Sequence, residues 1–184
     1  MSLIASAAFI FATQIPSAAP DRTKEIWDHV ENRFINQADI WFDLGEFPLA
    51  VSLLKVHSAS VPDDYEVMSS LGWMLENIQK KEEARSIYAE YSNRNPNDGD
   101  AAFALGFSYY NEKDWDNTIK VLEPTLTKNA SPNTYRVLAK SYERKSMYKD
   151  AIRIWELELK KFPGEPTAIA NIKRVKAKIA SGGK

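Results

Sequence analysis

The sequence predicts an all-α protein in which two-helix units follow one another along the chain. A period of about 34 residues separates Pro62 from Pro96, and Pro163 follows near a further double period. Gly72 and Gly106 show the same spacing as the first two prolines. No stretch combines strand-type alternation with hairpin turns. A fixed period of this length indicates a chain built from repeated helix-turn-helix units.

The first twenty residues are predicted to stand apart from these units. Residues 1–20 contain no charged side chain, and 3–12 form a run that is apolar apart from Ser6 and that small residues follow at 17–19. This order is typical of a secretory signal peptide, and the alternative is a disordered or loosely docked lead. A signal peptide over 1–19 would make the protein exported, either periplasmic or secreted; otherwise we expect it in the cytoplasm. The run is too short to cross a bilayer, so we expect no integral membrane segment in the mature chain.

Helical patterns begin directly after this segment. Asp21 is a suitable N-cap for a leading helix in which Ile26, Val30 and Phe34 recur at helical spacing. The turns that separate the later helices hold glycine, proline, asparagine and aspartate, and they come about every half-period: 44–46, 61–64, 95–99 and 162–164.

The units resemble the tetratricopeptide repeat family, whose pattern over about 34 residues is an aromatic, Leu-Gly, Tyr, Ala, an aromatic and Pro. The best-fitting unit carries Leu71, Gly72, Leu75, Ala84, Tyr88, Tyr91 and Pro96. The same register places four repeats at 31–64, 65–98, 99–131 and 132–165. The resemblance implies a right-handed solenoid, with a capping helix at 166–180 and a flexible tail at 181–184.

Small residues at equivalent positions explain how each pair of helices packs. Ala38, Gly72, Gly106 and Ala139 fall midway along the first helices, and we expect Ala50, Ala84, Thr118 and Ala151 of the second helices to meet them. Small side chains allow two helix axes to approach to about 8–9 Å. A single unit cannot bury its apolar face alone, so the core is expected to come from stacking.

Composition argues against catalysis. The 184 residues include no cysteine and only two histidines, His29 and His57, which do not stand at metal-ligand spacing with a partner. No glycine-rich phosphate loop occurs. Asp98 and Asp100 flank a turn and are better explained as helix caps than as an acid–base pair. We therefore predict no enzyme activity, no catalytic residue, no metal and no cofactor.

The positions that the core leaves unused predict a binding groove. In this family the first helices line the concave wall, which implies a groove of acids towards the N-terminus, aromatics in the middle and bases towards the C-terminus. An apolar centre between opposite charges fixes both the site and the direction of a bound segment. The candidate groove residues are Asp39, Phe42, Asp43, Trp73, Glu76, Asn77, Phe103, Phe107, Tyr110, Asn111, Arg136, Lys140 and Arg144.

The predicted function is a non-enzymatic scaffold that binds a peptide or helical segment of a protein partner in this groove. The lysine-rich clamp with which some family members hold a chaperone C-terminus is excluded, because Ile35, Asp39, Asp100 and Ala104 occupy its positions.

Two alternatives remain open. Residues 1–100 hold 16 of the 25 acids and 8 of the 24 bases, so an acidic end could stack on the basic end of a second copy, which would give a homo-oligomer. The other alternative is contact with nucleic acid or an anionic surface through the basic C-terminal helix. Nucleic acid is the less favoured partner because no aromatics alternate with the bases there. The bases concerned are Lys160, Lys161, Lys173, Arg174, Lys176 and Lys178.

Overall fold

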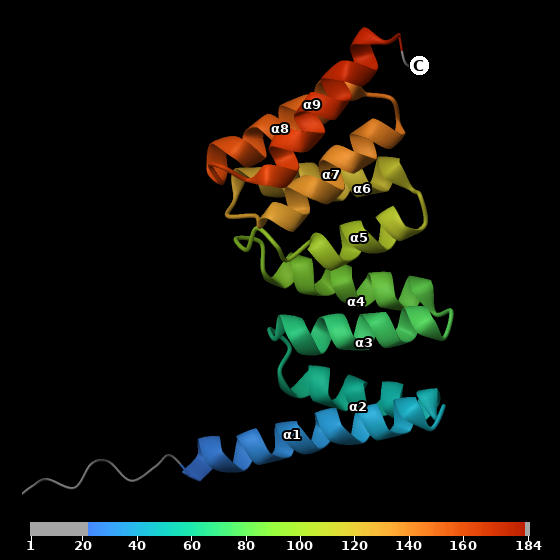
Figure 1. The fold of residues 1–184 in the computed structure, drawn as a ribbon. Helices are drawn as coiled ribbons and strands as arrows, with labels where there is room; N and C mark the ends of the chain where they lie inside the picture. Colours follow the sequence, from blue (N-terminus) through green and yellow to red (C-terminus); the bar gives the residue numbers. More distant parts are fainter. Residues whose placement is uncertain (1–21, 183–184) are drawn as a thin grey trace, which may run out of the picture.

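A computed structural model describes residues 22–182, and within them it contains helices and no strand. Figure 1 shows the helices stacked in chain order from α1 at one end to α9 at the other. The predicted signal peptide or lead at 1–20 lies outside the described residues. The elements are α1 (Arg22–Asp43), α2 (Phe47–Ser60), α3 (Tyr65–Asn77), α4 (Lys81–Arg94), α5 (Phe103–Asn111), α6 (Trp115–Leu122), the 3-10 helix η1 (Glu123–Thr127), α7 (Pro132–Arg144), α8 (Tyr148–Lys161) and α9 (Pro166–Ala180).

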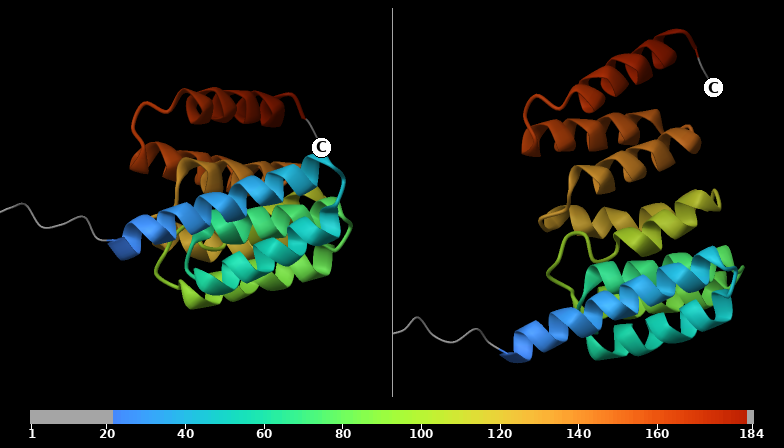
Figure 2. Two further views of the ribbon diagram at one scale, coloured as in Figure 1. Left: turned by 90° about the horizontal axis from the view of Figure 1, so that it is seen from below. Right: turned by 60° about the horizontal axis from the view of Figure 1, so that its bottom comes forward.

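The stack is the right-handed solenoid of helix pairs that the sequence predicts, with α9 as a single helix after the last pair. Figure 2 shows the twist along the stack and the first turns of α1 projecting beyond α2. No helix within 22–182 is long and apolar enough to cross a membrane.

Glycine allows the two helices of a pair to touch, although its contacts differ from those expected. A Cβ added to Gly72 would lie 2.0 Å from Cε1 of Tyr88, and one added to Gly106 would lie 2.4 Å from Cδ2 of Leu122. The atoms closest to each glycine therefore belong to a large residue one turn after Ala84 or Thr118, and not to the small residue itself. Ala84 and Thr118 are fully buried, and their small size leaves room for Tyr88 and Leu122 to reach the glycines.

The turn inside each pair of helices has the same backbone form in all four repeats. A left-handed conformation occurs at Gly45 (φ 76°), Gln79 (φ 64°), Lys113 (φ 63°) and Ser146 (φ 61°). Only the first of these residues is a glycine, so three turns accept the strain of a side chain at positive φ. This conformation therefore marks four equivalent turns, one between the two helices of each repeat.

Repeat three departs from its neighbours at both helices. Helix α5 begins at Phe103, one turn later than the register predicts, because residues 99–102 form a bend and a turn. A Cβ on Gly99 would lie 2.2 Å from the backbone nitrogen of Ala130, so this segment packs tightly on the loop before α7. Helix α6 stops at Leu122, since Pro124 cannot donate to a helical carbonyl, and the chain continues as η1.

Asp100 has a different role from the local cap expected for it. Its Oδ1 accepts hydrogen bonds from the backbone N–H of Ser131 and from the Thr134 hydroxyl, both at 2.9 Å. Asp98 in turn accepts a hydrogen bond from the backbone N–H of Asp100 at 2.9 Å. These bonds fasten the start of repeat three to α7 of repeat four.

The apolar interior divides into two clusters that meet at α5. One cluster runs from Ala38 to Ala101, and the other runs from Leu122 to Ala168. Ala104 and Leu105 of α5 pack on the first cluster, whereas Phe103 and Tyr110 pack on the second. Helix α5 is therefore the boundary between the two clusters.

Candidate functional site

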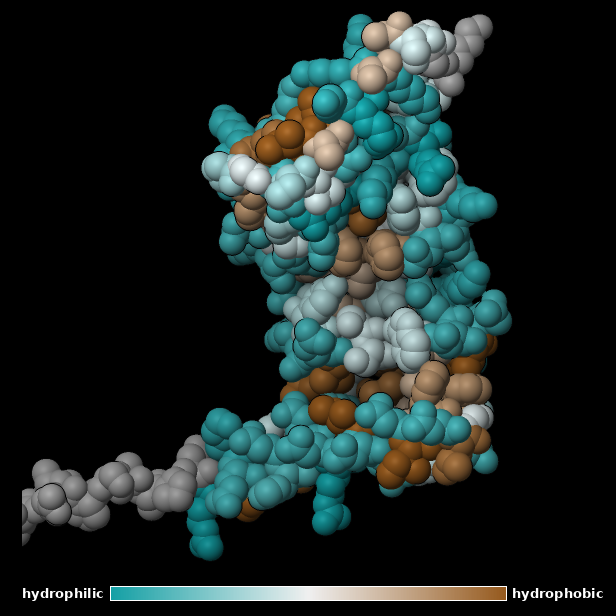
Figure 3. All heavy atoms as spheres, viewed as in Figure 1, coloured by the Kyte–Doolittle hydropathy of each residue, from teal (hydrophilic) through white to brown (hydrophobic). Residues whose placement is uncertain are grey.

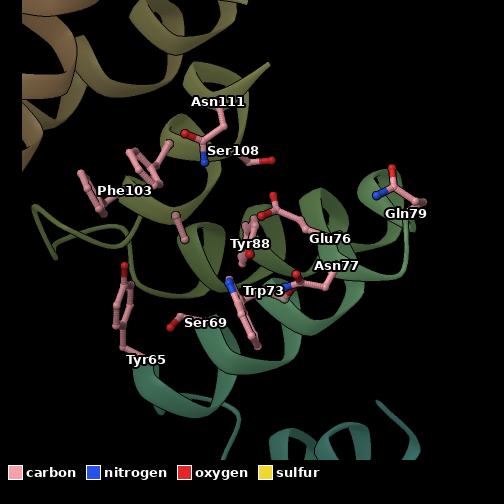
Figure 4. Close-up of a pocket in the computed structure, with 12 residues that line it drawn as sticks. Tyr65, Ser69, Trp73, Glu76, Asn77, Gln79, Tyr88, Phe103, Ser108 and Asn111 are labelled. Atoms are coloured by element: carbon pink, nitrogen blue, oxygen red, sulfur yellow. The ribbon is translucent and has the colours of Figure 1, made fainter. Parts of the chain in front are cut away.

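A cavity of about 500 Å³ lies at this boundary. Figure 4 shows its lining side chains coming from α3, α4 and α5 and from the turn at Gln79. Trp73 and Phe107 are half-exposed in it, with 50% and 40% of their surfaces accessible. The residues around it are Tyr65, Ser69, Trp73, Glu76, Asn77, Gln79, Tyr88, Phe103, Ala104, Phe107, Ser108 and Asn111.

Aromatic rings are stacked in series along one face of α5. The rings of Phe103 and Phe107 are 5.6 Å apart and 12° from parallel, and those of Phe107 and Tyr110 are 6.1 Å apart and 8° from parallel. Tyr110 also makes an edge contact with Trp115 at 5.2 Å. Residues three and four apart share a helix face, so this arrangement follows from sequence spacing. The stack holds the Phe107 ring rigidly at the cavity.

The opposite wall is formed by α3 and is supported by α1. The Trp73 ring lies 5.3 Å from that of Phe42, which itself makes an edge contact with Phe47. Below them the buried ring of Tyr88 covers Gly72 and forms the floor. Burial, and then the charge of Glu76, raise the pKa of Tyr88 well above its ordinary value, so its hydroxyl stays protonated.

A second cavity of about 410 Å³ adjoins the first, and Tyr65 and Phe103 line both. It lies beside Phe103, the first residue of α5. Asp98 and Asp100 supply its carboxylates, and the other lining residues are Ser131 and Asn133. Burial, followed by the charges of Asp100 and Glu66, raises the pKa of Tyr65 to about 12.

The carboxylates of the two cavities have no basic partner in the part of the chain that the structure describes. Within 22–182, neither Glu76 nor Asp98 nor Asp100 forms an ion pair, and no lysine or arginine lines either cavity. Acids on the second helices are paired with bases instead, as Glu83 is with Lys55. The groove is therefore acidic and apolar.

The three bases predicted at the C-terminal end of the groove differ in whether they are already paired. Arg136 is engaged within its own repeat: its Nε lies 3.2 Å from Oε1 of buried Glu158, and its Nη2 lies 2.9 Å from Oε1 of Glu165. Lys140 and Arg144 are exposed and have no ion pair within 22–182. The positive charge available on α7 is therefore that of Lys140 and Arg144.

Six of the predicted groove residues line the larger cavity and seven do not. The six are Trp73, Glu76, Asn77, Phe103, Phe107 and Asn111. Among the others, Phe42 and Tyr110 support the cavity through their rings, whereas Asp39, Asp43, Arg136, Lys140 and Arg144 lie away from its lining. The predicted groove residues did not include Tyr65 and Asp98, which line the smaller cavity. Sequence reasoning assigned Tyr88 to the core, where the ring is indeed buried.

Other features that could suggest chemistry have structural explanations. His57 is buried and stacks on Phe34 with ring centroids 4.9 Å apart. No group of acids and histidines within 22–182 could hold a metal ion. Of the C-terminal bases, Arg174 pairs with Glu143, Lys176 with Glu156, and Lys178 lies 4.8 Å from the centre of the Tyr148 ring. Much of that positive charge is already matched by the chain itself.

Comparison with known proteins agrees with this architecture. The sequence profile of the tetratricopeptide repeat matches residues 66–98. A structure of the MamA protein superposes with a TM-score of 0.61 at 18% identity, covering 83% of each chain. MamA from residue 41 to its end, from Desulfovibrio magneticus RS-1, gives a TM-score of 0.58 at 17% identity and covers 83% of this chain and 86% of that one.

A tetratricopeptide repeat protein from Parabacteroides merdae ATCC 43184 superposes with a TM-score of 0.57 at 14% identity, covering 83% of this chain and 59% of that one. No curated protein sequence matches the chain.

These observations first define a class, the α-solenoids of stacked helix pairs. Residues 66–98 match the tetratricopeptide repeat, and the helix pairs have the fold of tetratricopeptide repeat solenoids. Proteins of this kind generally act as scaffolds for protein–protein interaction.

Proposed function

We propose that this protein is a non-enzymatic scaffold that binds a segment of a partner protein in the groove between α3 and α5. One observation carries the proposal. Trp73 and Phe107 present half-exposed rings to the same cavity of about 500 Å³, although no core position requires them there. Large aromatic side chains held rigidly in a concave site are the usual anchors of protein interfaces.

The aromatic stack makes this groove suited to binding at little entropic cost. Phe107 is held between Phe103 and Tyr110, and Trp73 is held against Phe42. A partner that packs on these rings orders few new rotamers of the scaffold. The surrounding Asn77 and Asn111 offer amide groups for the backbone of a bound segment.

Selection of displayed peptides on the intact chain tests the proposal. Peptides selected against the parent protein would be titrated against Phe107→Ala, with Ile26→Ala as the control, since Ile26 is an exposed apolar residue on α1. We expect Phe107→Ala to weaken binding by about thirtyfold. We expect Ile26→Ala to leave it unchanged.

Circular dichroism of both variants separates binding from folding. Phe107→Ala removes an exposed ring, so its melting curve should stay close to that of the parent. Normal binding of selected peptides by Phe107→Ala would exclude the groove as their site. Loss of the fold would show that this ring belongs to the core.

A second candidate function, end-to-end assembly of copies, is favoured by the exposed apolar residues at both ends of the stack. Ile40, Leu44 and Leu49 are exposed at the α1–α2 end, and Ile169 and Ile179 on α9. Figure 3 shows brown apolar surface near both ends of the molecule. Terminal repeats of monomeric solenoids are usually polar on their outer face. Light scattering of the parent and Leu44→Ser at several salt concentrations tests this: a monomer under all conditions would exclude assembly.

A further inference from the structure

We infer that the groove selects a partner segment carrying an arginine, whose guanidinium enters the cavity between Tyr65, Phe103, Asp98 and Asp100 while a neighbouring apolar side chain packs on Trp73 and Phe107. This inference rests on the proposed function, because it names the chemistry of the segment that the same groove would bind. It differs from the sequence-based expectation that bases on α7 attract an acidic stretch of the partner.

Charge is the first argument. Glu76 lines the larger cavity, and Asp98 and Asp100 line the smaller one. No base of this chain between 22 and 182 lines either cavity or pairs with these three carboxylates. An acidic groove favours a cationic segment both in steering and in the final complex. An acidic segment would be repelled from this groove.

The shape and chemistry of the smaller cavity favour arginine over lysine. Asp100 has one oxygen, Oδ1, committed to Ser131 and Thr134, and Asp98 has its Oδ1 committed to the N–H of Asp100. Each keeps a second oxygen for a ligand. Two aromatic rings, Tyr65 and Phe103, stand beside these carboxylates. A planar guanidinium donates to carboxylates in its plane and stacks on aromatic rings with its faces, which an ammonium does not do.

The geometry of α5 fixes the spacing within the segment. Phe103 lines both cavities, and Phe107 follows it by four residues, or about 6 Å along the helix axis. An extended segment rises by about 3.3 Å per residue. The arginine and the apolar residue should therefore be about two positions apart, with both side chains on the same side of the extended segment.

Fluorescence anisotropy with labelled synthetic peptides tests the inference on the intact chain. The probe is an acetylated seven-residue peptide, Gly-Ser-Arg-Ser-Phe-Ser-Gly, with its C-terminus amidated. Matched probes replace its arginine with citrulline, lysine or glutamate, and another set moves the phenylalanine by one residue. We expect the arginine peptide to bind about tenfold more tightly than the citrulline peptide. We expect the glutamate peptide to bind least.

Variants of the protein locate the effect. Asp98→Asn keeps the oxygen that accepts from Asp100 and removes only the charge, so it should reduce the preference for arginine over citrulline to about threefold or less. Glu25→Gln is the control, since Glu25 is an exposed acid on α1, outside both cavities. It should leave the preference unchanged.

Each outcome separates this inference from the proposed function. Equal binding of the arginine, citrulline and glutamate peptides, with binding still lost in Phe107→Ala, would overturn the arginine site and leave the groove as a binding site. Tighter binding of the glutamate peptide would overturn it in favour of Lys140 and Arg144. Equal binding of the lysine peptide would overturn the guanidinium assignment. Failure of every peptide, both synthetic and selected from display, to bind the parent would overturn the proposed function itself.

Discussion

Repeats two and three share one register but differ in the length of their helices. Helices α3 and α4 have 13 and 14 residues, whereas α5 and α6 have 9 and 8. Their turns still place a left-handed residue at equivalent positions, Gln79 and Lys113. The period therefore determines where the chain turns, and single residues such as Gly99 and Pro124 determine how much of each half is helical.

The site lies at the shortened repeat. Asp98, Asp100 and Tyr65 line the smaller cavity beside the late start of α5 at Phe103. Repeat two, which is regular, contributes the Trp73 wall and the Tyr88 floor. A groove with a defined pocket thus arises where a regular repeat meets an irregular one.

The largest expected effect comes from removing the glycine that is specific to repeat three. Gly99→Ala would place a Cβ 2.2 Å from the backbone nitrogen of Ala130, and a backbone cannot rotate away as a side chain can. We expect the free energy of unfolding to fall by about 2–3 kcal/mol. Urea denaturation measures it, with exposed Asn97→Ala as the neighbouring control. An unchanged midpoint would mean that the loop at 129–130 adapts without cost.

Asp100 tests whether the junction of repeats three and four depends on its two hydrogen bonds. Asp100→Ala leaves the N–H of Ser131 and the buried hydroxyl of Thr134 without their acceptor. We expect a loss of about 2 kcal/mol in the free energy of unfolding. Asp100→Asn retains an acceptor oxygen and should recover most of it. Equal destabilisation by both variants would show that charge, and not hydrogen bonding, is what matters.

Acid should weaken the ionic contact between repeats two and three. Hydrogen bonds from Lys81 and Arg85 hold the pKa of Glu112 below its ordinary value of 4.5. The contribution of Glu112 to the free energy of unfolding is therefore present at neutral pH and is lost as the pH falls through its lowered pKa. Glu112→Gln should lower the free energy of unfolding by less than about 1 kcal/mol at pH 7, and the deficit should disappear in acid.

Glu158 should change the free energy of unfolding in the opposite direction as the pH falls. Burial raises the pKa of Glu158 above 4.5, with Arg136 opposing the shift. The folded state holds this proton more tightly than the unfolded state, so the contribution of Glu158 grows as the pH falls through its raised pKa towards 4.5. Urea titrations from pH 7 to 3.5 should show the free energy of unfolding of the parent rising relative to that of Glu158→Gln. A parallel pair of curves would contradict the raised pKa.

The smallest expected effect concerns the turn that the two repeats share. Lys113 adopts φ 63°, a conformation in which a side chain is strained. Lys113→Gly should raise the free energy of unfolding by about 0.5–1 kcal/mol. Gly45→Ala, at the equivalent turn of repeat one, should lower it by a similar amount. Thermal melts of both variants measure these changes in stability. If both variants changed in the same direction, the two turns would not be equivalent.

The repeated framework could be predicted from the sequence because its causes are local. Gly72 and Gly106 at one spacing, and helical periodicity between them, were enough to predict paired helices and the aromatic face of α5. The pocket depends on contacts across repeats. Tyr65 and Asp100 line one cavity although they are far apart in the sequence, and Arg136 is unavailable because it meets Glu158, 22 residues away. Neither arrangement leaves a periodic pattern.

The outer ion pairs have a mechanical consequence. Lys55 with Glu83, Arg85 with Glu112, Lys145 with Asp116 and Arg153 with Glu123 each join a repeat only to its neighbour. Within 22–182, none of these ion pairs joins repeats that are not adjacent, so they do not distribute a pulling force along the whole stack. A molecule pulled from its two ends should therefore lengthen in steps, each releasing one repeat, or about 115 Å of extended chain.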